Sequence, residues 1–193
     1  MKLAWVVAAV IACAPPPPPP KPPAPAPTPK PVEPSEPVGK QPGYVEMKAW
    51  LDVPLGGQGA LLLVDDPPTI VVPIFVGGTE SASIHGRMNG DKPPRPLTHD
   101  LLDRVLRELH ATLVQVQVDE LRHDGENGVY IGSIFVRDAH KRVIRIDARP
   151  SDAIALAIGA HVPIYVARKV LEAAGVPYDE VQRQLGARAQ PET

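Results

Sequence analysis

The chain has 193 residues, of which 26 are proline, and its formal net charge is −2. Fifteen of the prolines fall between Pro15 and Pro42, and such a stretch cannot build a hydrophobic core. From Tyr44 onward, 16 Lys and Arg stand against 20 Asp and Glu, which gives a net charge of −4. A protein that coats nucleic acid in general needs many basic residues to neutralise phosphates. The composition excludes that class and predicts one folded domain.

The first residues resemble an export signal that ends in a lipidation site. Lys2 supplies a positive charge, and Leu3 to Ala12 form a ten-residue apolar run. A membrane-spanning helix needs about 20 apolar residues, whereas the apolar region of a signal peptide has about 7–15. Cys13, the single cysteine of the chain, follows a small residue as in the lipobox of bacterial lipoproteins. We expect a signal peptide over 1–12 and lipidation of the cysteine; the alternative is a misassigned start or an apolar tip that is not cleaved.

Residues 13–43 form the predicted tether between the lipid and the folded domain. Six consecutive prolines and repeated Pro-Ala-Pro units favour an extended polyproline II conformation, and the alternative is plain disorder. Acyl chains on Cys13 would hold the protein at a membrane surface. Ala14 stands where lipoproteins retained in the inner membrane often carry Asp. We therefore expect a lipid-anchored protein of the cell envelope, with the outer membrane favoured over the inner one.

The folded region begins with short apolar segments typical of strands. Strands are expected over 44–53 and 60–64 around a Gly-Gly-Gln-Gly turn. A third strand is expected over 70–76, where Pro73 indicates a bulge or an edge. A weak helix is expected over 79–88, because a glycine lies inside it.

A stronger helix is expected to begin at Thr98, which is a good N-cap residue. Apolar residues recur along this segment with helical spacing and form one stripe, as in an amphipathic helix. The residues of the stripe are Leu101, Leu102, Val105, Leu106 and Leu109.

The second half of the folded region reads as a meander followed by a buried helix. The segments 113–121, 128–137 and 142–148 alternate apolar and polar residues and predict three antiparallel strands. Residues 151–158 are apolar nearly all round, which predicts a helix buried in the core. A short strand and a closing helix are expected over 162–166 and 169–174.

Together these elements predict a single compact α+β domain over 44–176, with a mostly antiparallel or mixed sheet and about four helices. Residues 177–193 are expected to form a C-terminal extension. The segment 72–76 (VPIFV) matches the segment 162–166 (VPIYV). This repeat suggests an internal pseudo-duplication.

Polar residues cluster where the last strand of the meander turns into the buried helix. Arg145 and Asp147 point to one face of the strand, and Arg149 follows them. Ser151 and Asp152 lie in the first turn of the helix. Helix N-termini present unpaired N–H groups that bind anions, so this corner could hold a phosphodiester. The structural alternative is that Asp152 complements the helix dipole and pairs with Arg149.

The helix near Thr98 begins in the same way, since His99 and Asp100 lie in its first turn. Histidine is a common general base near neutral pH. The structural alternative is that Asp100 complements the helix dipole and His99 lies on the surface or in a polar contact. Glu80 occupies a similar position in the weak helix. If tertiary packing joins these helix starts, a hard divalent cation could bind to oxygen ligands. The candidate ligands are Glu80, Asp100, Asp147 and Asp152.

Four segments of the folded region occur together in an order typical of one protein family. They are 72–77 (VPIFVG), 96–102 (PLTHDLL), 147–157 (DARPSDAIALA) and 163–166 (PIYV). With them the chain resembles the bifunctional nuclease domain family over about Val45 to Gly175. The resemblance implies a compact α+β domain, assembly into a homo-oligomer, and nucleic acid, both RNA and DNA, as the substrate.

From the resemblance and the residue types we predict a nuclease that hydrolyses phosphodiester bonds of RNA or DNA. The expected catalytic residues are His99, Asp100, Asp147 and Asp152. Within this set, the three aspartates would organise a divalent metal, Mg²⁺ or Mn²⁺, and the histidine would shuttle a proton. The residues expected to bind the substrate are Arg95, Arg149 and Ser151.

The chain departs from the family pattern over 79–88, where polar residues replace much of an Ala-rich helix. For this reason Glu80 is left out of the expected site. Export to the envelope would separate the protein from intracellular nucleic acid. That location favours either scavenging of external nucleic acid or a non-catalytic role. The alternative function is therefore an envelope-anchored binding or scaffold module on the same fold.

Overall fold

The structure, a computed structural model, describes residues 38–55, 58–124 and 127–188. The expected signal peptide, Cys13 and most of the tether lie outside these ranges, as does the end of the C-terminal extension. Within the described ranges, no helix combines the length and the apolar character needed to cross a membrane.

The described strands form one mixed sheet in the order β6-β5-β4-β7-β1-β2-β3-β8. Strand β7 runs parallel to β4, and every other neighbouring pair is antiparallel. The strands are β1 (Tyr44–Leu55), β2 (Gln58–Val64), β3 (Ile70–Gly77), β4 (Thr112–Asp124), β5 (Asn127–Arg137), β6 (Val143–Ala148), β7 (Ile164–Ala167) and β8 (Val176–Pro177).

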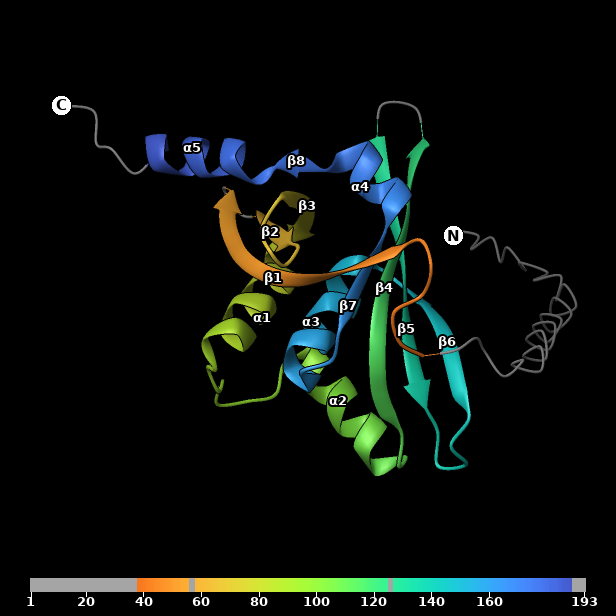
Figure 1. Ribbon diagram of the computed structural model, residues 1–193. Helices are drawn as coiled ribbons and strands as arrows, with labels where there is room; N and C mark the ends of the chain where they lie inside the picture. The colour runs from red at the N-terminus through yellow and green to blue at the C-terminus, as the bar shows by residue number, and fades with distance from the viewer. Residues whose placement is uncertain (1–37, 56–57, 125–126, 189–193) are drawn as a thin grey trace, which may run out of the picture. The chain divides into compact units, whose positions relative to one another are not determined.

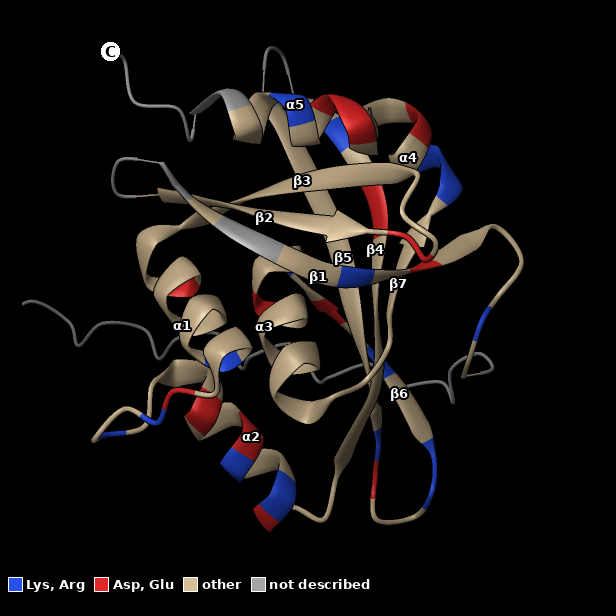
Figure 2. Ribbon diagram, turned by 60° about the vertical axis from the view of Figure 1, so that its left-hand side comes forward, with Lys and Arg blue, Asp and Glu red and all other residues tan. Residues whose placement is uncertain are grey.

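Helices α1, α2 and α3 gather on one side of the sheet, with α1 and α3 against its strands (Figure 1, Figure 2). Helix α5 packs against β8 and β3, at the edge of the sheet that β8 forms. The helices are α1 (Gly78–Asn89), α2 (Thr98–Glu108), α3 (Pro150–Ala160), α4 (Arg168–Ala174) and α5 (Tyr178–Arg188). The α+β class and the mixed sheet are confirmed, and α5 brings the described helices to one more than the four expected.

The main core lies between the sheet and the helices α1 and α3. Leu61 and Val72 from neighbouring strands are fully buried, and so is Ile154 from α3. Helix α3 buries seven of its eleven residues, as its apolar sequence predicts. A smaller cluster on the other face of β2 and β3 packs against Trp50 and α5.

The predicted strands are confirmed, including the antiparallel meander β4-β5-β6. Strand β3 pairs with β2 along its length, but with β8 only through Ile70 and Val71. Pro73 therefore lies in a part of β3 that has one neighbouring strand, as the edge interpretation requires. The matching segments form β3 and β7, and each of these strands runs directly into a helix. Their surroundings differ, because β7 lies at the centre of the sheet.

The N-terminus of α2 corrects one prediction. Thr98 is the first helical residue and not the cap; the N-cap is Leu97. The Asp100 carboxylate accepts a hydrogen bond from the Leu97 N–H at 2.9 Å, so an acidic residue three positions later satisfies the helix end. The apolar stripe of α2 also turns outward. Leu106 packs against the core, and the rest of the stripe is exposed.

Candidate functional site

The N-terminal turns of α1, α2 and α3 meet at a cavity of about 90 Å³, called here the three-helix cavity. The convergence that the sequence left open is thus present in the structure. Each helix N-terminus directs the positive end of its dipole to the cavity, which favours negative charge there. The residues that line it are Thr79, Glu80, Ser83, Leu97, Thr98, His99, Arg149 and Asp152.

Arg149 connects two of the helix starts from the N-cap position of α3. Its Nε donates to Asp152 Oδ2 at 2.8 Å, and its Nη2 donates to Glu80 Oε1 at 2.6 Å and to Asp152 Oδ1 at 3.1 Å. The side chain is 67% exposed, so the guanidinium lies at the mouth of the cavity. Since these contacts use Nε and Nη2, Nη1 is the nitrogen left for a ligand.

His99 of α2 contacts both α1 and α3, and it is only 6% exposed. Its Nδ1 lies 2.9 Å from Ser83 Oγ on α1, and its Nε2 lies 3.2 Å from Asp152 Oδ1 on α3. Both ring nitrogens are therefore engaged by protein groups. In this arrangement the imidazole orients Asp152, and it would need to exchange a partner before it could transfer a proton to a substrate.

The two carboxylates of the cavity are held in their ionised form. Burial alone would raise the pKa of Asp152, but hydrogen bonds from Arg149 and then from His99 outweigh burial, and the pKa is lowered. The pKa of Glu80 is lowered by a hydrogen bond to its own backbone and by that from Arg149. In return, Asp152 and Glu80 raise the pKa of Arg149. The result is a charged network in which the carboxylates stay ionised at neutral pH.

The structure brings Arg149, His99 and Asp152 together and places the other expected site residues elsewhere. Asp100 turns away from the cavity and pairs with Arg87 at 2.7 Å. Asp147 is exposed on β6, opposite Ser133 of β5. Two further residues do not line the cavity. Arg95 is exposed in the loop before α2, and Ser151 is buried in the first turn of α3.

The expected metal ligands do not fit a divalent cation as they are arranged. The three aspartates Asp100, Asp147 and Asp152 lie apart. Asp152 and Glu80 are both already paired with Arg149. Over the described ranges, no group of three or more His, Cys, Asp or Glu side chains is placed to hold a metal ion. Binding of Mg²⁺ or Mn²⁺ by oxygen ligands would require Arg149 to release the carboxylates.

Sequence reasoning missed Ser83 and undervalued Glu80. Both belong to the segment that departs from the family pattern, yet Ser83 contacts His99 and Glu80 contacts Arg149. Gly77 also matters, because a Cβ there would come within 2.7 Å of Glu80 Oε2. A local signal existed for Ser83, since a serine in a helix otherwise expected to be Ala-rich indicates a polar contact.

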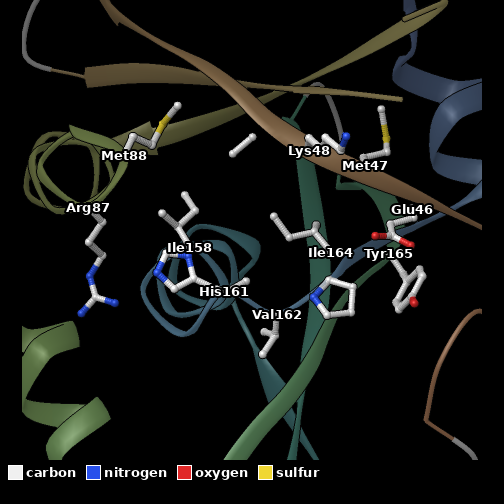
Figure 3. Close-up of a pocket in the computed structure, with 13 residues that line it drawn as sticks. Glu46, Met47, Lys48, Arg87, Met88, Ile158, His161, Val162, Ile164 and Tyr165 are labelled. Atoms are coloured by element: carbon white, nitrogen blue, oxygen red, sulfur yellow. The ribbon is translucent and has the colours of Figure 1, made fainter. Parts of the chain in front are cut away.

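The largest cavity described, of about 570 Å³, lies away from all these residues (Figure 3). It is bordered by β1, β7 and the ends of α1 and α3, with Ile158 and Ile164 among its apolar lining and His161 beside them. Arg87 at its wall is already paired with Asp100 and Asp103. The three-helix cavity is smaller, but it is the better candidate for a functional site because ionisable side chains from three helices converge there.

A family model described as the bifunctional nuclease domain matches residues 61–179. That range contains the whole three-helix cavity. An uncharacterized protein from Mycobacterium tuberculosis is 39% identical over 119 residues, which are 62% of this chain and 68% of that protein.

The chain also matches plant proteins. Bifunctional nuclease 1 of Oryza sativa subsp. japonica is 26% identical over 111 residues, which are 57% of this chain and 33% of the plant protein. The protein named bifunctional nuclease of Oryza minuta matches to the same extent. The match thus spans a third of each plant protein. With the family model covering more than half of its length, the chain belongs to the bifunctional nuclease domain family.

Proposed function

We propose that this protein is a nuclease that hydrolyses phosphodiester bonds of RNA or DNA at the three-helix cavity. The observation that carries the proposal is the position of Arg149, an exposed guanidinium above three converging helix N-termini. A phosphodiester there would meet a positive side chain and positive dipole ends together. The names of the plant relatives support the same reaction class.

In this proposal each residue of the cavity has a separate task. Arg149 contacts a phosphate oxygen through Nη1, while Asp152 and Glu80 fix the orientation of its guanidinium. His99 holds Asp152 in place, and it would move a proton only after exchanging Asp152 or Ser83 for the substrate or water. Carboxylate ligands favour Mg²⁺ or Mn²⁺ as the cofactor. Because the donors do not fit that cation as arranged, no step is assigned to a metal.

Cleavage of single-stranded RNA and DNA by the purified full chain tests the proposal. We expect Arg149→Gln and Asp152→Asn to lower the rate about 100-fold or more, the scale for removing one charge-stabilising donor. Parallel reactions with Mg²⁺, with Mn²⁺ and with EDTA decide the metal requirement.

The matched control changes the exposed pair Arg183–Asp179 on α5 in the same way, as Arg183→Gln and Asp179→Asn. These variants should cleave at the unmodified rate. Full activity in both cavity variants, confirmed folded by circular dichroism, would contradict the assignment of the site. Cleavage no greater than in a mock purification would contradict the nuclease itself.

A second candidate function is a non-catalytic binding or scaffold module. The observation that favours it is that Glu80, Asp152 and both nitrogens of His99 are already satisfied by protein partners. Such a network stabilises a fold without any substrate. This candidate predicts no cleavage, and a loss of about 0.5–2 kcal/mol of unfolding free energy in Asp152→Asn, as for other contacts at a helix N-terminus.

The proposed setting is the cell envelope. Lipidation of Cys13 would anchor the protein, and the Pro-rich residues that follow would separate the domain from the membrane. We propose the outer membrane as the site of anchoring, because Ala14 follows the cysteine. The family resemblance adds assembly into a homo-oligomer.

A further inference from the structure

Helix α2 and its two cap residues expose five large apolar side chains. The exposed fractions are 41% for Leu97, 57% for Leu101, 38% for Leu102, 41% for Val105 and 66% for Leu109. Together these side chains form a patch on the order of 400 Å², within the size range at which a surface patch on a monomer is often functional. The five residues are called here the α2 stripe.

The outward direction of the α2 stripe has a physical cause on the inner side of the helix. There Asp100 and Asp103 pair with Arg87 of α1 at 2.7 Å and 2.8 Å, and His99 bonds to Ser83. These polar contacts fix the rotation of α2 about its axis. The apolar residues then lie on the opposite side of the helix, where their exposure to water is unfavourable.

We propose that the α2 stripe is the interface between two copies of this chain, packed through antiparallel α2 helices about a two-fold axis near Val105. This inference deepens the homo-oligomer named above and rests on it. Leu97, Leu101, Val105 and Leu109 follow one another at four-residue spacing, so they form a single ridge. Two such ridges interdigitate in the commonest class of helix packing, and a two-fold axis lets each copy offer the same patch.

The charges around the stripe fit this arrangement. Arg104 and Glu108 are exposed, and neither forms an ion pair with a described residue. In an antiparallel pair, the arginine of one copy lies within about one turn of the glutamate of the other. A standard interface buries about 800 Å² on each partner. The stripe would supply its apolar centre, and these charged residues would supply the rim.

A lipid surface fits the stripe less well. Helices that lie in a membrane interface carry an excess of Lys and Arg on the polar face and aromatic residues on the apolar face. Helix α2 has two arginines against three acidic residues and no aromatic side chain, and both charge signs are interspersed along it (Figure 2). Repulsion from anionic lipids would oppose binding.

Site-directed cross-linking tests the interface in the full chain. Cys13→Ser removes the single native cysteine, and Val105→Cys then places one thiol at the centre of the stripe. Treatment with a bismaleimide that spans about 8–10 Å, the distance between packed helix axes, should give a covalent dimer on a denaturing gel. The matched control is Phe75→Cys on β3, which replaces a side chain that is 67% exposed. It should give little dimer.

Sedimentation of the full chain and of Leu101→Asp gives a second readout. The unmodified protein should sediment as a dimer and Leu101→Asp as a monomer, with unchanged circular dichroism. A dimer that persists in Leu101→Asp, or equal cross-linking at positions 75 and 105, would overturn the α2 stripe as the interface, although the protein could still be a homo-oligomer. A monomeric unmodified protein would overturn both, whatever the cleavage assay shows. Binding to anionic vesicles that is lost in Leu101→Asp would identify a membrane as the occupant and overturn the inference.

Discussion

Arg149 determines the charge balance of the three-helix cavity. It pairs with both Asp152 and Glu80, so its single positive charge lowers the repulsion between the two carboxylates and their repulsion of an approaching phosphate. Its own exposure of 67% leaves it accessible to a ligand. One residue thus serves the stability of the corner and the proposed binding of substrate. For this reason activity and stability must be measured separately in every variant of the site.

The lowered pKa values of Asp152 and Glu80 make stability depend on acid pH. Because both pKa values lie below the ordinary values of 3.8 and 4.5, the unfolded chain binds more protons in that range. The contribution is complete above the ordinary values and is lost as the pH falls through the lowered ones. We expect the melting temperature to fall between about pH 5 and pH 3, and to fall less in Asp152→Asn.

Melting curves followed by circular dichroism from pH 7 to about pH 3 measure this difference. Asp65 and Asp138 also have lowered pKa values, but they are the same in both proteins, so they cancel in the comparison. Asp179→Asn serves as the control, since its carboxylate is 82% exposed on α5. Identical pH profiles for the unmodified protein and Asp152→Asn would refute the coupling.

At the scale of elements, Arg87 joins the three helices that build the cavity. From α1 it pairs with Asp100 and Asp103 of α2, and its Nη1 donates to the Ala155 carbonyl of α3 at 3.1 Å. Gly159 of α3 leaves the room for it, because a Cβ there would lie 1.9 Å from Nη1. This connection holds α2 in the rotation that brings His99 to the cavity and turns the α2 stripe outward.

Replacing Arg87 by methionine should destabilise the protein by about 1.5–3 kcal/mol, the scale for hydrogen bonds to charged groups. The lower end is expected, because the partner carboxylates are 34% and 28% exposed. Urea denaturation at pH 7 measures the loss. Arg142→Met, which removes an exposed pair with Asp138, should cost much less. Equal losses in the two variants would show that the ion pairs of Arg87 contribute no more than an exposed pair.

At the scale of the whole molecule, the proposed tether and anchor would decide where the domain acts. A lipid at Cys13 followed by residues rich in proline would place the cavity outside the cytoplasm and within reach of external nucleic acid. If residues 13–43 form the proposed polyproline II tether, they would span up to about 3.1 Å per residue. That reach would set how far from the membrane a substrate could be bound.

Cys13→Ala should abolish lipidation and release the protein from the membrane. Labelling of bacterial cells with radioactive palmitate measures the first effect, and fractionation of membranes measures the second. The expected result is labelled, membrane-bound unmodified protein and unlabelled Cys13→Ala, with Ala14→Gly as the control that keeps the cysteine. Unlabelled wild-type protein in the soluble fraction would contradict the anchor.

The fold was largely predictable because its elements have strong local signals. Alternating apolar residues specified the meander β4-β5-β6, and the apolar sequence of 151–158 specified the buried α3. The start of α2 was predicted less well: the sequence predicted Thr98 as the N-cap, but the N-cap is the preceding residue, Leu97. Helix boundaries depend on which side chain reaches the free N–H groups, and that contact is tertiary in part.

The sequence by itself determined the domain class, the strands, the presence of the helices and the charged residue types near their N-termini. Only the tertiary structure decided which helix starts meet. His99, Asp152 and Arg149 converge, while Asp100, adjacent to His99 in the sequence, points to Arg87. The reason is geometric: neighbouring helical residues point about 100° apart, and packing selects which direction faces the cavity. The same choice of rotation turned an apolar stripe outward, which no periodicity in the sequence can reveal.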